Sequence, residues 1–207
     1  MWRADVDETV LHEVRRLLAP EPEPTTTARE RAATATPPEP EIGALLRWAA
    51  RTVSARGIVE VGAAGGVSAL WLVPELPERG VLTSIEPDPH AHALATEAVA
   101  SIDASARVRS ILGDPVTVLD RLSDGAYDLA ILQSQPAATT ALLAHVRRLL
   151  RPGGVLLVRG ALRHGEHAEV LARFLQALAD DAGFTATVLP VDDGLVLATR
   201  LEDPHEA

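Results

Sequence analysis

"GIVEVGAAGGVSALWL" (residues 57–72) decides the fold, because it passes from strand to glycine loop to helix within one short stretch. Its first five residues are apolar except for Glu60, which is typical of a buried strand. Gly62, Gly65 and Gly66 follow, and glycine lets the backbone turn sharply and lets a ligand approach it closely. A helix beginning near Gly66 would offer free N–H groups to a polar ligand.

Strand-like and helix-like segments alternate on either side of this loop. The expected strands are residues 57–62, 80–86, 106–113, 127–132 and 154–160, and the expected helices are residues 65–76, 89–101, 115–122, 137–150 and 167–181. Such alternation predicts an α/β fold with a parallel sheet. Two apolar strands, 184–191 and 194–200, close the chain around Asp192-Asp193-Gly194, a strong hairpin signal that adds an antiparallel strand.

The chain before residue 41 differs from this pattern. We expect residues 1–40 to form a helical extension and residues 41–207 to form the ligand-binding domain, which opens with a helix over 41–54. The extension reads as an amphipathic helix over 4–19 and a short helix over 27–34, each followed by a proline-rich break.

Composition excludes several classes of function. The net charge of -10 argues against a nucleic-acid binder and against an anionic-membrane binder, since both need a basic surface. Cysteine is absent, and all 19 basic residues are arginine, so thiolate sites and lysine-based catalysis are excluded. No apolar run approaches the ~20 residues that span a bilayer, and we expect a cytoplasmic protein.

Two cofactor classes fit a glycine loop followed by an acid. A dinucleotide site usually reads G-x-G-x-x-G, which Gly62-Ala63-Ala64-Gly65 does not, so S-adenosylmethionine (SAM) is favoured over nicotinamide. Glu60 would pair with the ammonium of SAM or, alternatively, with an arginine of the N-terminal helices. Glu86 ends the next strand, where a carboxylate can accept ribose hydroxyls. Asp114 suits either an adenine contact or a helix N-cap.

The order and spacing of these motifs resemble the small SAM-dependent O-methyltransferases related to catechol O-methyltransferase. The matching segments are "VEVGAAGGVSALWL", "GVLTSIEPDP", "LGDP", "YDLAIL", "LLRPGGVLLV" and "LPVDDGLVLATR". The resemblance spans residues 27–200 and implies a Rossmann-like, seven-stranded, mostly parallel sheet with an antiparallel last strand. It also implies cofactor contacts at nine positions: Glu60, Gly62, Ala63, Gly65, Ser68, Glu86, Asp114, Pro115 and Gln133.

The family's metal site is not conserved in this sequence. Metal-dependent members end the fourth strand in Asp-Ala-Asp-Lys and the fifth in Asp-Asn, whereas this chain has Gln133-Ser134-Gln135-Pro136 and Arg159-Gly160. Amides and a guanidinium cannot make a Mg²⁺ site, so we expect no metal. Either Arg159 stabilises a substrate oxyanion in metal-free methylation of a small molecule, or the protein is an inactive SAM-binding sensor or scaffold.

Three further expectations concern side chains outside the cofactor motifs. His164, just after the fifth strand, is the best available general base, although a solvated helix start is the alternative. Trp48 and Trp71 fall on apolar helix faces and are expected in the core. The stripe Val6, Val10, Val14 and Leu17 must bury against its own domain or a second copy, and we expect a homodimer.

Overall fold

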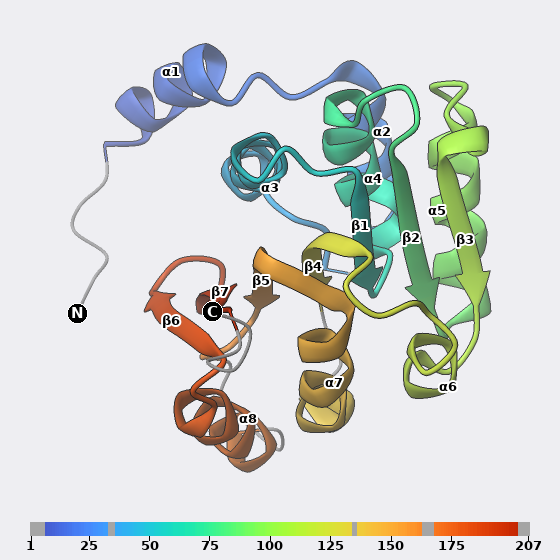
Figure 1. The fold of residues 1–207 in the computed structure, drawn as a ribbon. Helices are drawn as coiled ribbons and strands as arrows, with labels where there is room; N and C mark the ends of the chain where they lie inside the picture. Colours follow the sequence, from blue (N-terminus) through green and yellow to red (C-terminus); the bar gives the residue numbers. More distant parts are fainter. Residues whose placement is uncertain (1–6, 33–35, 134–135, 163–167, 203–207) are drawn as a thin grey trace.

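The computed structural model describes residues 7–32, 36–133, 136–162 and 168–202, which form a sheet of seven strands with helices on both faces (Figure 1). The strand order is β3-β2-β1-β4-β5-β7-β6. The strands are β1 (Gly57–Val61), β2 (Val81–Glu86), β3 (Val108–Leu112), β4 (Tyr127–Leu132), β5 (Leu150–Arg159), β6 (Phe184–Leu189) and β7 (Leu195–Arg200). β1 to β5 are parallel, while β7 is antiparallel to both β5 and β6, so the predicted Rossmann-like fold is confirmed.

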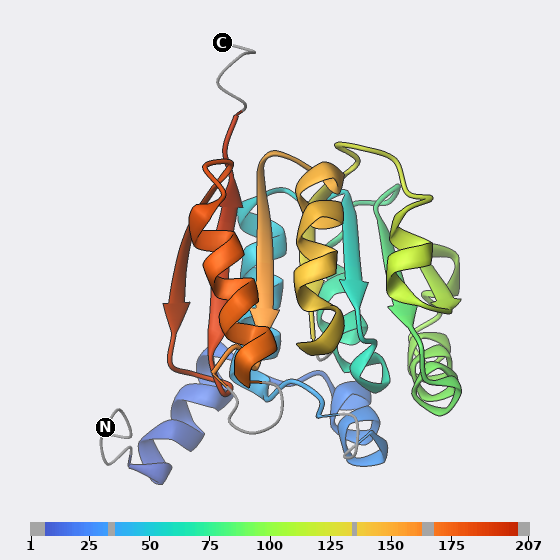
Figure 2. The same ribbon diagram turned by 90° about the horizontal axis from the view of Figure 1, so that it is seen from below.

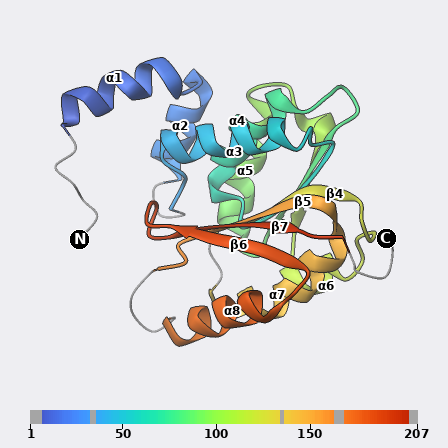
Figure 3. The same cartoon turned by 60° about the vertical axis from the view of Figure 1, so that its left-hand side comes forward.

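Helices surround the sheet, and those on its two faces pack against the strands through buried apolar side chains. They are α1 (Glu8–Leu18), α2 (Glu23–Arg31), α3 (Pro40–Thr52), α4 (Val67–Leu72), α5 (Pro89–Ala100), α6 (Pro115–Leu119), α7 (Pro136–Leu149) and α8 (Ala168–Asp180). Short 3-10 turns are η2 (Ala64–Gly66), η3 (Val73–Glu75) and η4 (Ser105–Arg107). Helices α3, α4 and α5 lie on one face, and α6, α7 and α8 on the other (Figure 3). Each face buries its own apolar core against the strands.

The closing hairpin forms at the predicted residues. Asp192, Asp193 and Gly194 all have positive φ, at 52°, 55° and 95°, a conformation that Asp tolerates better than most side chains. The register between β5 and β7 pairs Arg159 with Leu195. The hairpin turn is therefore held beside the carboxyl end of β5, which is the end where ligands bind in open α/β sheets.

Three local predictions were wrong. Helix α2 begins at Glu23, not near residue 27, because Pro24 falls in its first turn, where proline is tolerated. Strand β5 begins at Leu150, and residues 151–154 bulge out between the Tyr127–Leu150 and Leu129–Val155 pairs. Trp48 is 62% exposed, because it faces away from the α3 side that packs on the sheet, whereas Trp71 is buried as expected.

The N-terminal helices lie toward the edge of the sheet to which β1 and β5 point (Figure 2). Helix α1 contacts α3, where Arg15 and Glu41 form a 2.6 Å ion pair. The apolar side chains of Val10, Val14 and Leu17 stay exposed, while Val6 lies outside the described residues. Within the described ranges, no helix is both long and apolar enough to cross a membrane.

Candidate functional site

The glycine loop between β1 and α4 is held in place by Glu86. The backbone N–H of Ala63 donates to Oε2 of Glu86 at 2.8 Å, and the N–H of Asp88 donates to Oε1 at 3.0 Å. Gly62 has φ 87°, a left-handed conformation that favours glycine. Glu86 is only 7% exposed, so its carboxylate fixes the loop at the end of β2. Each oxygen keeps a lone pair for a further donor, such as a ribose hydroxyl.

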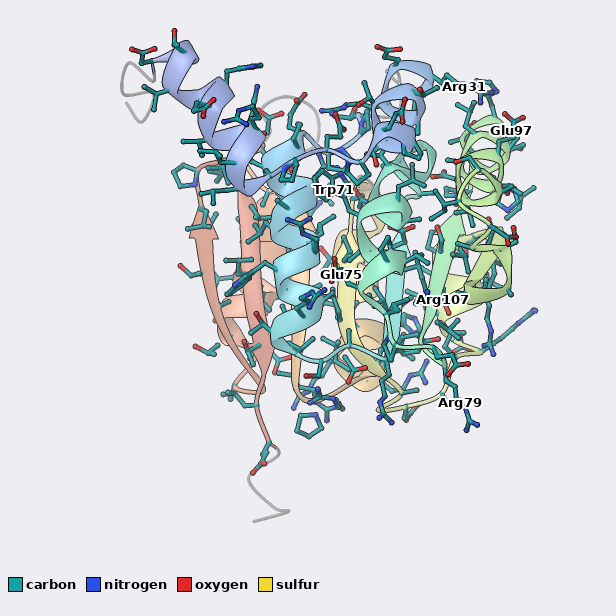
Figure 4. All side chains as sticks on the ribbon, turned by 90° about the horizontal axis from the view of Figure 1, so that it is seen from above. Arg31, Trp71, Glu75, Arg79, Glu97 and Arg107 are labelled. Atoms are coloured by element: carbon teal, nitrogen blue, oxygen red, sulfur yellow. The ribbon has the colours of Figure 1, made fainter. Side chains whose placement is uncertain are left out.

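Helix α2 covers this loop, and glycine at position 65 permits the contact. A Cβ on Gly65 would lie 2.1 Å from Cβ of Ala32, and its φ is 64°. The side chains of Arg31 and Glu97 join α2 to α5 at the same place as an exposed ion pair (Figure 4). The N-terminal segment is therefore packed directly on the candidate cofactor loop.

Glu60 is a fully buried acid with one oxygen unsatisfied. Its Oε2 accepts from the Ser68 hydroxyl at 2.6 Å and from Nε2 of Gln133 at 3.0 Å. Its Oε1 has no hydrogen-bond donor within the described part of the chain. Burial raises the pKa of Glu60 to about 7, and hydrogen bonds from its neighbours, Ser68 first among them, counteract part of this rise. The expected alternative, an ion pair with an arginine of the N-terminal helices, does not form among those residues.

Asp114 caps helix α6. Its Oδ2 accepts from the backbone N–H of Thr117 at 2.8 Å and from the Thr117 hydroxyl at 2.7 Å, and these bonds lower the pKa of Asp114. The N-cap interpretation is therefore confirmed. The cap uses a single oxygen, which leaves Oδ1 available beside Pro115, the first residue of α6.

A second polar chain runs from Glu60 to the closing hairpin. Gln133 at the end of β4 accepts at Oε1 from Nη1 of Arg159, at 2.8 Å. Arg159 then forms a two-pronged ion pair with Asp192, through Nε and through Nη2, the latter at 2.9 Å from Oδ1. The Arg159 side chain is 3% exposed and the Asp192 side chain 11%. The positive charge of Arg159 is thus neutralised at close range.

The guanidinium also reaches the N-terminal segment. Nη1 of Arg159 donates to the carbonyl of Thr36 at 3.3 Å, so four of its five N–H groups are committed to protein acceptors. The second N–H on Nη2 has no acceptor among the described residues. Among the described residues there is no cluster of three or more His, Asp or Glu side chains that could hold a metal.

An open pocket of about 510 Å³ adjoins this ion pair. It lies between the segment at Thr36–Glu39 and the hairpin turn, with Leu162 at its side. Asp192 lines the pocket while it binds Arg159. The pocket has the size of a small-molecule site and lies at the carboxyl end of the sheet.

The structure brings Glu60, Ser68, Gln133 and Arg159 into one hydrogen-bonded network, and it places Ala63 against Glu86. His164, Ser134 and Gln135 lie outside the described residues. Sequence reasoning missed Asp192, which it used only as a turn signal. A buried arginine at a strand end requires a counter-charge, and that requirement was the available clue.

Comparisons with known proteins agree with this architecture. The family model for O-methyltransferases matches residues 8–201. A relative from Mycobacteroides abscessus, itself named only provisionally as an O-methyltransferase, is 39% identical over 171 residues, covering 78% of this chain and 80% of its own. The chain therefore belongs to the O-methyltransferase family.

Solved structures share the fold at lower identity. The O-methyltransferase TomG from Streptomyces achromogenes, involved in tomaymycin synthesis and solved with SAM, has a TM-score of 0.86 at 24% identity, covering 98% of this chain and 100% of its own. The O-methyltransferase from Bacillus cereus, solved with S-adenosylhomocysteine (SAH), has a TM-score of 0.83 at 21% identity, with coverage of 93% and 97%.

Proposed function

We propose that the protein is a SAM-dependent O-methyltransferase that acts on a small molecule without a divalent metal. The observation that carries the cofactor assignment is the unsatisfied Oε1 of Glu60, buried at the end of β1 beside the glycine loop. A buried acid with a free oxygen fits a cationic ligand group, and SAM carries an ammonium. When bound, SAM supplies an electrophilic methyl group.

The other proposed cofactor residues lie at or just after the carboxyl ends of β1, β2 and β3. Glu86 would accept the ribose hydroxyls, and Asp114 with Pro115 would flank the adenine through the oxygen that the helix cap leaves available. The backbone of Gly62, Ala63 and Gly65 would approach the cofactor closely. These assignments rest on the family resemblance and agree with the preorganised geometry of the loop.

Metal independence is supported by the chemistry of Arg159. Its guanidinium occupies the end of β5, where metal-dependent relatives carry a carboxylate ligand, and it is fixed by Asp192 and Gln133. A cation held there with one free N–H can orient an acceptor oxygen, and the neighbouring pocket would hold the rest of the acceptor. His164 is the proposed general base.

The proposal is tested by calorimetric titration of the purified protein with SAM and SAH, in Mg²⁺ and in EDTA, followed by methyl-transfer assays on catechols and phenols. We expect SAM and SAH to bind with micromolar affinity in both Mg²⁺ and EDTA. We also expect that EDTA does not reduce the rate of methyl transfer. Glu60→Ala should lose binding, while His164→Ala should bind SAM normally and lower kcat. Absence of SAM and SAH binding would overturn the assignment. Binding without turnover would favour the inactive sensor or scaffold.

A further inference from the structure

A basic pocket opens at the amino ends of the parallel strands, opposite to the carboxyl ends where the candidate cofactor site lies. It has a volume of about 340 Å³, and its lining includes Arg56 before β1, Arg109 on β3 and Arg121 after α6. Tyr127 at the start of β4 and Thr83 of β2 line it as well. These strands are five or six residues long, so the pocket lies roughly 17–20 Å from the cofactor edge.

The three guanidinium groups have no carboxylate partner among the described residues, although acids outnumber bases in the chain by 29 to 19. Elsewhere the described arginines are mostly paired, as Arg148 is with Asp124 and Arg151 with Asp128. No described residue that lines the pocket is acidic. Unpaired cations therefore gather in one concave place on a protein of net charge -10.

The polar groups of the pocket floor match the same ligand chemistry. The hydroxyls of Thr83 and Tyr127 lie 3.4 Å apart, and both side chains are buried. One hydroxyl can donate to the other, and the second proton is then available to a ligand oxygen. Arginine forks bind phosphate oxygens through two parallel hydrogen bonds, so three arginines around hydroxyl donors suit a multivalent phosphate group.

We propose that this pocket, named here the arginine pocket (Arg56, Thr83, Arg109, Arg121 and Tyr127), binds a small phosphorylated anion at a second site separate from the cofactor site. Its volume is in the range of small-ligand sites. The arginine pocket shares no residue with the cofactor network.

Titration of the full-length protein with inorganic phosphate, pyrophosphate and tripolyphosphate tests the proposal by calorimetry and by the shift in Tm. We expect one pyrophosphate per chain, with Arg109→Ala and Arg121→Ala each weakening binding about tenfold or more. Arg109→Lys keeps the charge but loses the fork, and should fall between wild type and alanine. Arg173→Ala is the matched control, because Arg173 is an exposed arginine of α8 without an ion pair in the described chain.

The proposal would be overturned if sodium chloride of equal ionic strength gave the same heat and the same Tm shift as pyrophosphate. It would also be overturned if Arg173→Ala weakened pyrophosphate binding as much as Arg109→Ala does. The absence of any heat or Tm shift would overturn it too. Retained far-ultraviolet circular dichroism and an unchanged Tm without ligand would show that each variant folds. SAH titration of the same variants keeps this result separate from the cofactor assignment, because loss of pyrophosphate binding should leave SAH binding intact.

Discussion

Glu60 links the protonation state of the protein to its stability and to its cofactor. Its pKa in the folded protein is about 7, against an ordinary value of 4.5, so folding disfavours the charged form. The contribution of Glu60 to the free energy of unfolding is therefore fully present below pH 4.5. This contribution is lost as the pH rises through the folded-state pKa of about 7. The difference corresponds to about 3 kcal/mol.

We predict that Glu60→Gln removes this pH dependence. In urea titrations, the free energy of unfolding of the wild type should be roughly 2–3 kcal/mol lower at pH 8 than at pH 5. The same difference should be much smaller for the variant. Wild type should also release a proton when it binds SAM at pH 6, because the ammonium favours the carboxylate. Calorimetry in buffers of different ionisation enthalpy measures that proton. Identical pH profiles for both proteins would show that Glu60 does not titrate in this range.

Asp192 is the residue that makes a buried Arg159 tolerable. We predict that Asp192→Ala costs about 3–5 kcal/mol of unfolding free energy, because it leaves a buried guanidinium without its counter-charge. Asp124→Ala is the control, since the Arg148–Asp124 pair is exposed and should contribute at most about 1 kcal/mol. Denaturant titrations of the two variants give the comparison. Equal losses would mean that the burial of the Arg159 pair has no energetic consequence.

At the scale of elements, the glycine loop depends on the helix above it. Gly65 and Gly125 have nearly the same φ, 64° and 61°, but a Cβ on Gly125 would meet nothing within 4 Å. We predict that Gly125→Ala costs only the backbone strain of about 1–2 kcal/mol. Gly65→Ala should cost more and should raise hydrogen exchange in α2, because the new methyl overlaps Ala32.

Adding Ala32→Gly to Gly65→Ala should restore part of the lost stability, because it removes the overlapping methyl group. The strain at φ 64° would remain, so the rescue should stop near the Gly125→Ala value. Unfolding titrations of Gly125→Ala, Gly65→Ala and the Gly65→Ala/Ala32→Gly double variant complete this test. If Ala32→Gly gives no rescue, the contact between α2 and the loop is not the cause of the loss.

The elements that were predicted correctly are those whose sequence pattern depends only on residues close together in the chain. The β–loop–α alternation and the Asp-Asp-Gly turn depend on neighbouring residues, so they could be read directly. The side of α3 that Trp48 occupies, and the partner of Arg159, depend on packing and on the register between β5 and β7. Pro24 misled the prediction because proline ends a helix from inside but is accepted in its first turn.

At the scale of the whole molecule, apolar side chains of α1 and α3 remain exposed. Val10, Val14 and Leu17 of α1 are exposed, and Trp48 of α3 is 62% exposed. We predict a homodimer that buries this stripe, as the amphipathic pattern requires a covering surface. Light scattering at tens of micromolar protein should give twice the chain mass.

Leu17→Glu should shift that mass toward the monomer, because a charge would be buried in the contact. Leu112→Glu is the control, since Leu112 is an exposed leucine on β3 at the far edge of the sheet. A wild-type monomer at this concentration would exclude the dimer, and the stripe would then be an ordinary exposed surface.

The Arg159–Asp192 pair also has an evolutionary consequence. Replacing Arg159 first would leave the buried carboxylate of Asp192 without its partner, and replacing Asp192 first would leave the buried guanidinium without its partner. Each single substitution therefore gives a less stable protein. The two positions are epistatic, and they should covary among descendants of this lineage. A carboxylate at the end of β5 would need a compensating change in the hairpin, because it would face the carboxylate of Asp192 in place of the guanidinium.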